Sequence, residues 1–186
     1  MAIIAAKYSG ISIDKILNSI SKLKPVEGRF EKIGKIKNQS KVILDYAHTP
    51  DALKTCLLNL REQFPNKTIT VLFGCGGNRD QNKRSKMGKV ASEFADSIIL
   101  TNDNPRFENP LKIRRDIKKG IKKKRIIEIS NRAIAITQAV YNLNSGDILL
   151  VAGKGHEKTQ DIGNKKIFFS DRKVILNAIK LSLIHI

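Results

Sequence analysis

The chain has 186 residues and a formal net charge of +18, from 35 lysines and arginines against 17 aspartates and glutamates. No apolar run approaches the roughly 20 residues that a membrane-spanning helix needs, and two cysteines are too few for a disulfide framework or a zinc cluster. These features argue against an integral membrane protein and a disulfide-rich secreted domain. They favour a globular protein of the reducing cytoplasm.

The excess of positive charge has two interpretations. A strongly basic chain is typical of nucleic-acid-binding proteins. Here, however, the lysines are scattered, only Lys118–Arg125 forms a block, and no aromatic residue interleaves with it. A Lys-, Ile- and Asn-rich composition is also typical of an AT-rich genome, and a basic cleft raises the local concentration of an anionic substrate. We expect no nucleic-acid partner, and we keep a basic nucleic-acid-binding module as the alternative from another class.

Residues 3–24 are predicted to form two helices that are separated at Gly10. The second helix follows Ser12, a residue that commonly caps helices, and Pro25 is expected to end it. This segment has too little apolar surface to fold alone. We therefore expect residues 1–26 to be the helical end of a larger unit.

From about residue 31 the sequence alternates short β-branched runs with helical patterns. This alternation predicts an α/β domain with a Rossmann-like, mostly parallel sheet and helices on both faces. We expect the domain to span residues 27–180. Strands are predicted at 31–37, 41–46, 68–73, 97–101, 125–129, 147–152 and 166–169, and helices at 50–63, 84–95, 110–120, 131–143 and 171–181.

Helix starts are marked by capping residues. Thr49-Pro50 and Asn109-Pro110 each place a proline at the first helical position, where its missing N–H leaves no bond unmade. Ser170-Asp171 opens the last helix with a serine, a residue that commonly caps helices. These signals support the predicted helix boundaries.

Four polar motifs follow four of the predicted strands. In an open α/β sheet, ligands bind at the carboxyl ends of the strands, so these motifs are predicted to surround one site. The motifs are Asp45–Asp51, Gly74–Asp80, Asp103–Arg106 and Gly153–Glu157.

The glycine-rich motif is not a Walker A loop, because it lacks the Gly-Lys-Ser/Thr ending. Its glycines let backbone amides approach an anion, and Arg79 adds a fixed cationic fork. Lys83 and Arg84 crowd the same loop. A tight strand-to-loop turn without a ligand is the alternative.

The motif Asp103–Arg106 combines a carboxylate, an amide and a guanidinium on one rigid turn. Arginine binds carboxylates through two parallel hydrogen bonds, and asparagine both donates and accepts. The turn therefore suits the head group of an amino acid. A polar turn before the helix at Pro110 is the alternative.

The last motif offers Glu157 as an acceptor for a substrate ammonium, while its two glycines permit close backbone approach. His156 is more typical of a structural histidine. His48 has two open roles: binding a nucleotide or carboxylate, or stabilising its own turn. No spacing resembles a zinc site, and Cys75 lacks a base partner, so we predict neither a metal site nor a cysteine nucleophile.

These four motifs, in this order and after Gly28-Arg29-Phe30-Glu31, resemble the C-terminal domain of the Mur ligases over about residues 3–180. The resemblance implies an ATP-dependent ligase of peptidoglycan synthesis, in which an amino acid attacks an acyl phosphate to form an amide. It also implies that ATP and Mg²⁺ are bound mainly by a central domain whose P-loop is missing here. Residues 1–26 would then be the helical C-terminal remnant of that central ATPase domain. We therefore expect no catalytic residue in this chain and no ligation by it alone, although residues from about 27 onward should fold.

Within the family, the turn at 103–106 is similar to that of members that add meso-diaminopimelate to UDP-MurNAc-L-Ala-D-Glu. The resemblance assigns Asn104 and Arg106 to the diaminopimelate carboxylate, with Arg79, Gly153 and Glu157 completing the amino-acid site. Another Mur ligase or a folylpolyglutamate synthetase-like ligase is the alternative within the enzyme class, and this turn argues against both.

The resemblance further assigns Arg29, His48 and Asp51 to the neighbourhood of the nucleotide. We expect a cytoplasmic monomer without membrane or metal partners of its own. Residues 181–186 can be encoded by a transposon end that serves as a sequencing adapter, so we expect this tail to be non-native.

Overall fold

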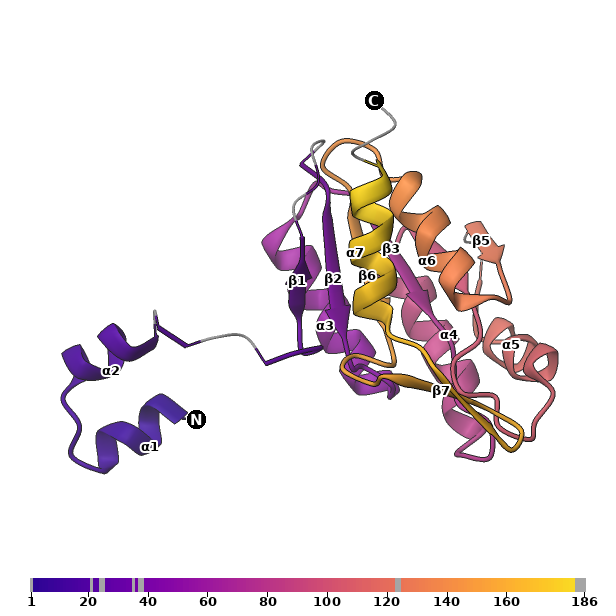
Figure 1. The fold of residues 1–186 in the computed structure, drawn as a ribbon. Helices are drawn as coiled ribbons and strands as arrows, with labels where there is room; N and C mark the ends of the chain where they lie inside the picture. Colours follow the sequence, from indigo (N-terminus) through magenta and orange to yellow (C-terminus); the bar gives the residue numbers. More distant parts are fainter. Residues whose placement is uncertain are drawn as a thin grey trace.

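The computed structural model describes residues 2–20, 22–23, 26–34, 36, 39–122 and 125–182. Their centre is a six-stranded sheet in the order β1-β2-β6-β3-β4-β5, in which β1 is antiparallel to β2 and the other neighbours are parallel (Figure 1). The predicted α/β class with a mostly parallel sheet is confirmed. The strands are β1 (Glu31–Ile33), β2 (Lys41–Asp45), β3 (Ile69–Phe73), β4 (Ser97–Leu100), β5 (Arg125–Glu128) and β6 (Ile148–Ala152).

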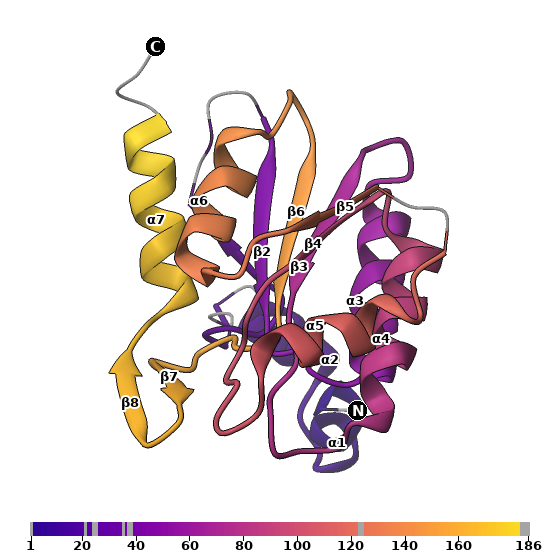
Figure 2. The ribbon, with the colours of Figure 1, turned by 90° about the vertical axis from the view of Figure 1, so that its right-hand side faces the viewer.

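Helices cover both faces of this sheet, as predicted (Figure 2). One face is packed by α3, α4 and α5, and the opposite face by α6 and α7. Each predicted helix of the α/β body is present, with ends shifted by up to two residues. The helices are α3 (Pro50–Gln63), α4 (Asn82–Phe94), α5 (Pro110–Lys118), α6 (Arg132–Tyr141) and α7 (Asp171–Ser182).

Each face of the sheet has its own hydrophobic core, and alternate side chains of the same strand pack into the two cores. In β2, Ile43 packs with the α3 side, whereas Val42 and Leu44 pack with the α7 side. In β6, Leu150 and Leu149 divide in the same way. Strand segments that are buried on both faces are continuously apolar, which is why Val42–Leu44 and Ile148–Ala152 are recognisable in the sequence as short apolar runs.

The helix caps form as the sequence predicts. The Thr49 hydroxyl accepts from Ala52 N at 3.3 Å, and Asn109 Oδ1 accepts from Leu111 N at 2.9 Å. Ser170 Oγ accepts from Lys173 N at 3.4 Å. These bonds satisfy backbone donors that the first helical turn leaves without partners.

The strand predicted at 166–169 is present, but it does not belong to the six-stranded sheet. It is β8 (Lys165–Phe168), which pairs antiparallel with β7 (Thr159–Ile162) in a separate hairpin. The sequence did not predict β7, because its side chains are polar or lie at the surface and show no alternation. The hairpin is held by its contacts with the turn after β4, where Ile162 forms a bridge with Arg106.

The N-terminal helices α1 (Ala2–Tyr8) and α2 (Ile13–Ile20) are set apart from the α/β body (Figure 1). α1 buries none of its residues, and α2 buries only Ile16. Apolar side chains such as Leu17 are exposed. The predicted helix end at Pro25, part of the predicted strand 31–37 and tail residues 183–186 lie outside the described residues. None of the described helices is long and apolar enough to cross a membrane.

Deleting residues 1–26 is expected to leave the stability of the α/β body nearly unchanged. Residues after this point anchor the chain to the body, because Phe30 N donates to Asp45 Oδ2 at 2.7 Å and Gly28 packs against the backbone of Gly155. The free energy of unfolding in urea should differ from that of the full chain by no more than about 0.5 kcal/mol. A loss of several kcal/mol would show that α1 and α2 stabilise the body.

Candidate functional site

The loops after β2, β3, β4 and β6 line one cavity of about 440 Å³ at the carboxyl ends of the parallel strands. All four sequence motifs contribute to its wall. A separate hollow of about 490 Å³ at the start of α4 contains none of the predicted site residues. The residues that line the motif cavity are Tyr46, His48, Thr49, Gly74, Cys75, Gly76, Arg79, Asp80, Lys83, Asp103, Asn104, Arg106, Gly153 and Glu157.

Six of the eight predicted site residues therefore meet in this cavity: the five assigned to the amino acid, and His48. The other two do not line it. Arg29 lies over the Tyr46 ring, 4.6 Å from its centroid, and Tyr46 itself faces the cavity. Asp51 is exposed in the first turn of α3.

Arg106 has a left-handed backbone conformation, with φ of +50°, which is uncommon for a residue other than glycine. Its N–H donates to Asp161 O at 3.0 Å, and its carbonyl accepts from Gly163 N at 2.7 Å. Its Nη1 donates to Gly77 O at 2.9 Å. The β7–β8 hairpin and the glycine-rich loop thus hold the guanidinium at the cavity wall.

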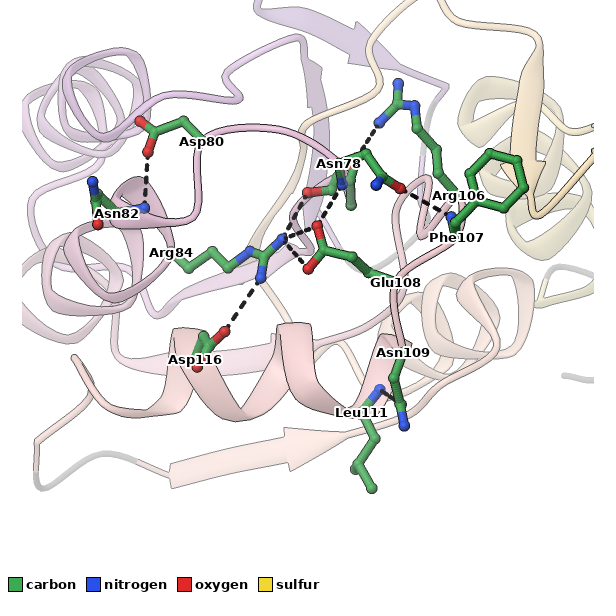
Figure 3. Close-up of polar contacts among 12 residues, drawn as sticks. Asn78, Asp80, Asn82, Arg84, Arg106, Phe107, Glu108, Asn109, Leu111 and Asp116 are labelled. Carbon is green, nitrogen blue, oxygen red and sulfur yellow. Dashed lines mark hydrogen bonds and ion pairs between the residues drawn. The ribbon is translucent and has the colours of Figure 1, made fainter.

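The glycine-rich loop is docked on the turn after β4. Gly77 N donates to Asn104 O at 2.9 Å, and Asn78 Oδ1 accepts from Phe107 N at 3.0 Å (Figure 3). A Cβ on Gly77 would lie 2.0 Å from Pro105 O, so only glycine allows this approach. The loop's glycines serve this close packing as well as the shape of the cavity.

Arg84 was grouped with the cations that crowd this loop, but the structure turns it away from the cavity. Its buried guanidinium donates to both Glu108 oxygens at 3.0 and 2.9 Å and to Asp116 Oδ2 at 3.2 Å (Figure 3). Arg84 therefore ties α4 to α5 and to the turn before it. Arg79 and Lys83 remain as the basic side chains of this loop that line the cavity.

A buried lysine connects the third and fourth motifs. Lys154 Nζ donates to Asn104 Oδ1 and to Glu157 Oε2, each at 2.8 Å, and Asn104 Nδ2 donates to the same Glu157 oxygen at 3.1 Å. Burial raises the pKa of Glu157, but these hydrogen bonds and the charge of Lys154 outweigh it and hold that pKa below its usual value. Sequence reasoning missed Lys154. Its position between two glycines, three residues before a carboxylate, was the available signal.

Gly153 is required by its surroundings. It has φ of +113°, and a Cβ there would lie 3.0 Å from Asp103 Oδ2. Asp103 in turn accepts from Asn104 N at 2.6 Å through its side chain and from Gln160 Nε2 at 2.5 Å through its carbonyl. Asp103 therefore shapes the turn that presents Asn104.

Tyr46 stands at the centre of a group of rings beside the cavity. The His48 and His156 rings lie 4.6 and 5.2 Å from it, centroid to centroid. His48 also has local bonds, since its Nδ1 lies 2.9 Å from Tyr46 O and its carbonyl accepts from Lys83 Nζ at 2.8 Å. Both roles considered for His48, ligand contact and turn stabilisation, are compatible with this placement.

Cys75 lines the cavity but is chemically unsuited to attack. Its Sγ lies 3.6 Å from Met87 Sδ, and burial raises the pKa of the thiol to about 12. Within the described ranges, no group of three or more His, Cys, Asp or Glu side chains is placed to hold a metal ion. The charged residues that line the cavity are of both signs, which suits a ligand that carries both a positive and a negative charge. They are Arg79, Lys83, Arg106, Asp80, Asp103 and Glu157.

The family model described as "Mur ligase, glutamate ligase domain" matches residues 28–155. The UDP-N-acetylmuramoyl-L-alanyl-D-glutamate–2,6-diaminopimelate ligase of Rickettsia typhi is 46% identical over 176 residues, which cover 94% of this chain and 35% of that protein. The chain thus spans about a third of the length of the curated relatives it matches.

A solved structure of a UDP-N-acetylmuramoyl-L-alanyl-D-glutamate–2,6-diaminopimelate ligase superposes with a TM-score of 0.79 at 38% identity, covering 98% of this chain and 37% of that one. Folylpolyglutamate synthase from Thermotoga maritima superposes with a TM-score of 0.58 at 21% identity, covering 82% and 34%. At that identity the second likeness concerns the fold alone.

Proposed function

This chain belongs to the Mur ligase family, and from that premise we propose that it is the amino-acid-binding C-terminal part of an ATP-dependent ligase of peptidoglycan synthesis. The proposed reaction adds meso-diaminopimelate to UDP-MurNAc-L-Ala-D-Glu. The sequence contains no P-loop motif, so the chain's own contribution is to bind and orient the incoming amino acid. Holding the amine in a fixed direction lowers the entropic part of the barrier to its attack.

The observation that carries the proposal is the placement of opposite charges across one cavity. Arg106 and Asn104 come from the loop after β4, and Glu157 comes from the loop after β6. A guanidinium and an amide suit a carboxylate, while a carboxylate suits an ammonium. Meso-diaminopimelate carries such an amino–carboxyl pair at its distal end, whereas L-lysine has only the distal ammonium. Arg79 and the Gly153 backbone complete the proposed amino-acid site.

The nucleotide side of the proposal depends on the group around Tyr46. Arg29 stacks on that ring, and His48 lies against it at the cavity rim, so a cation, an aromatic face and a ring nitrogen are available together. These groups fit contacts to a base, ribose or phosphate. ATP would supply the phosphoryl group that activates the acceptor carboxylate. The proposed role of Asp51 is peripheral, because it lies outside the cavity wall.

Mg²⁺ is not assigned to side chains of this chain, since the described residues offer no cluster for it. In the proposal it is held elsewhere in the ligase, together with most of the ATP. The two free cysteines suit the reducing cytoplasm, where we place the ligase as a monomer.

Calorimetric titration of the full 186-residue chain with meso-diaminopimelate, with L-lysine as control, tests the proposal. We expect binding of diaminopimelate and at least about 100-fold weaker binding of lysine, because lysine leaves Arg106 without a carboxylate. Tighter binding of lysine would overturn the substrate assignment. Binding of neither amino acid would remove support for a site that is preorganised in this chain.

A further inference from the structure

Lys154 is one of the most deeply buried side chains of the chain, with an exposed fraction of 0%. An ammonium without water is unfavourable unless it has partners. Lys154 has two, Asn104 Oδ1 and Glu157 Oε2, both at 2.8 Å. Asn104 is proposed to bind the ligand's carboxylate and Glu157 its ammonium, so Lys154 contacts both binding residues. Lys154 itself does not line the cavity.

Lys154 determines which way the Asn104 amide faces. An ammonium has only donors, so it must meet the amide oxygen rather than the amide nitrogen. Asp161 N, at 3.1 Å, is a second donor to the same oxygen. The amide nitrogen is then directed to Glu157 at 3.1 Å. One of its two hydrogens remains for a ligand in the cavity that Asn104 lines.

Lys154 also helps to keep the Glu157 carboxylate ionised. Among the described residues, Glu157 Oε2 accepts from both Lys154 and Asn104, whereas no hydrogen bond engages Oε1. Charged groups that act on this carboxylate are Lys154 in its own loop, Arg106 in the loop after β4 and Arg132 at the start of α6. All three are cations, so the carboxylate is kept ionised with one oxygen available.

We infer that Lys154 is a positioning residue that sets the polarity of the site, making Asn104 a donor toward a carboxylate and Glu157 an anionic acceptor toward an ammonium. The inference rests on the proposed function for the identity of the ligand. It goes beyond that function because it assigns specificity to a lysine that would touch no substrate. If Lys154 were only a counter-ion for Glu157, its removal would leave the orientation of the Asn104 amide unchanged, because Asp161 N also donates to the amide oxygen.

The first test is nuclear magnetic resonance of the full chain carrying Lys154→Met, with Lys158→Met as the matched control. Lys158 is an exposed lysine next to Glu157, so both variants lose one positive charge in the same loop. Lys154→Met should raise the pKa of Glu157, read from its carboxyl carbon, because the ammonium that favours the ionised carboxylate is lost. It should also shift the Asn104 side-chain amide signals. Lys158→Met should leave the amide signals in place.

The second test keeps the inference falsifiable if Lys154→Met does not fold. Asn104→Asp preserves a partner for Lys154 but replaces the proposed N–H donor by an oxygen that repels a carboxylate. Both Lys154→Met and Asn104→Asp should weaken meso-diaminopimelate binding at least about 10-fold, whereas Lys158→Met should not.

The outcomes separate the two proposals. Unchanged Asn104 amide signals in folded Lys154→Met, or unchanged ligand binding in Asn104→Asp, would overturn the positioning role. If the unaltered chain binds no diaminopimelate, the proposed function loses its support, and the magnetic resonance readouts alone decide whether Lys154 orients Asn104 and Glu157.

Discussion

Replacing Arg106 with alanine is expected to abolish measurable binding of meso-diaminopimelate to this chain. The guanidinium is held at the cavity wall by Gly77 O, and its Nη2 lies 4.0 Å from Asp161 Oδ2. These contacts leave a charged donor fork preorganised for a carboxylate. Loss of a charge-assisted pair costs about 3 kcal/mol, which corresponds to a loss in affinity of about 100-fold or more. Calorimetric titration measures it.

Two control variants separate the effect of losing the Arg106 side chain from the effect of its strained backbone. Arg106→Gly removes the same guanidinium but tolerates φ of +50°, so it should lose binding equally. It should be more stable than Arg106→Ala by about 1 kcal/mol. Arg115→Ala, on the exposed face of α5, removes an arginine outside the cavity and should bind normally. Retained binding in both Arg106 variants would contradict the assignment of this residue.

Replacing Asp171 with leucine is expected to destabilise the protein by about 3 to 5 kcal/mol, because it leaves a fully buried guanidinium without its counter-ion. Arg132 Nε and Nη2 donate to the two Asp171 oxygens at 2.8 and 2.7 Å, and both side chains have 0% exposure. Arg132 Nη2 also donates to Ala152 O at 3.0 Å. The pair therefore joins the start of α6, the start of α7 and the end of β6.

Urea unfolding of three variants checks this expectation. Arg132→Met should cost a similar amount, whereas the double variant Arg132→Met/Asp171→Leu should recover much of the loss, because no charge is left unpaired. The exposed pair Lys89–Glu93 on α4, with Nζ and Oε1 3.8 Å apart, is the matched control. Its removal should change the free energy of unfolding by less than about 0.5 kcal/mol. Equal, additive effects of the two single variants would argue against a coupled pair.

The sequence by itself determined the secondary structure of the α/β body and the position of the site. Val42–Leu44 of β2 and all of β6 are buried against helices on both faces, so these residues are apolar, and such runs are recognisable without a structure. The caps at Thr49 and Asn109 act within one helical turn, and so they too are local signals. Since parallel strands end at the same edge of a sheet, four motifs at four strand ends were enough to predict one shared cavity.

Only the tertiary structure decided which side chains of these motifs face the cavity. The sequence does not distinguish Arg79 from Arg84, which are five residues apart, but Arg84 lies in α4 and forms ion pairs with Glu108 and Asp116, so it is buried away from the cavity. The local sequence does not show that Lys154 is buried and paired, because one of its two partners, Asn104, lies 50 residues earlier. The β7–β8 hairpin likewise has little apolar pattern, and its place follows from backbone bonds to the turn at Arg106. Burial of a charge depends on partners that are remote in sequence, and a reading of local patterns contains no information about them.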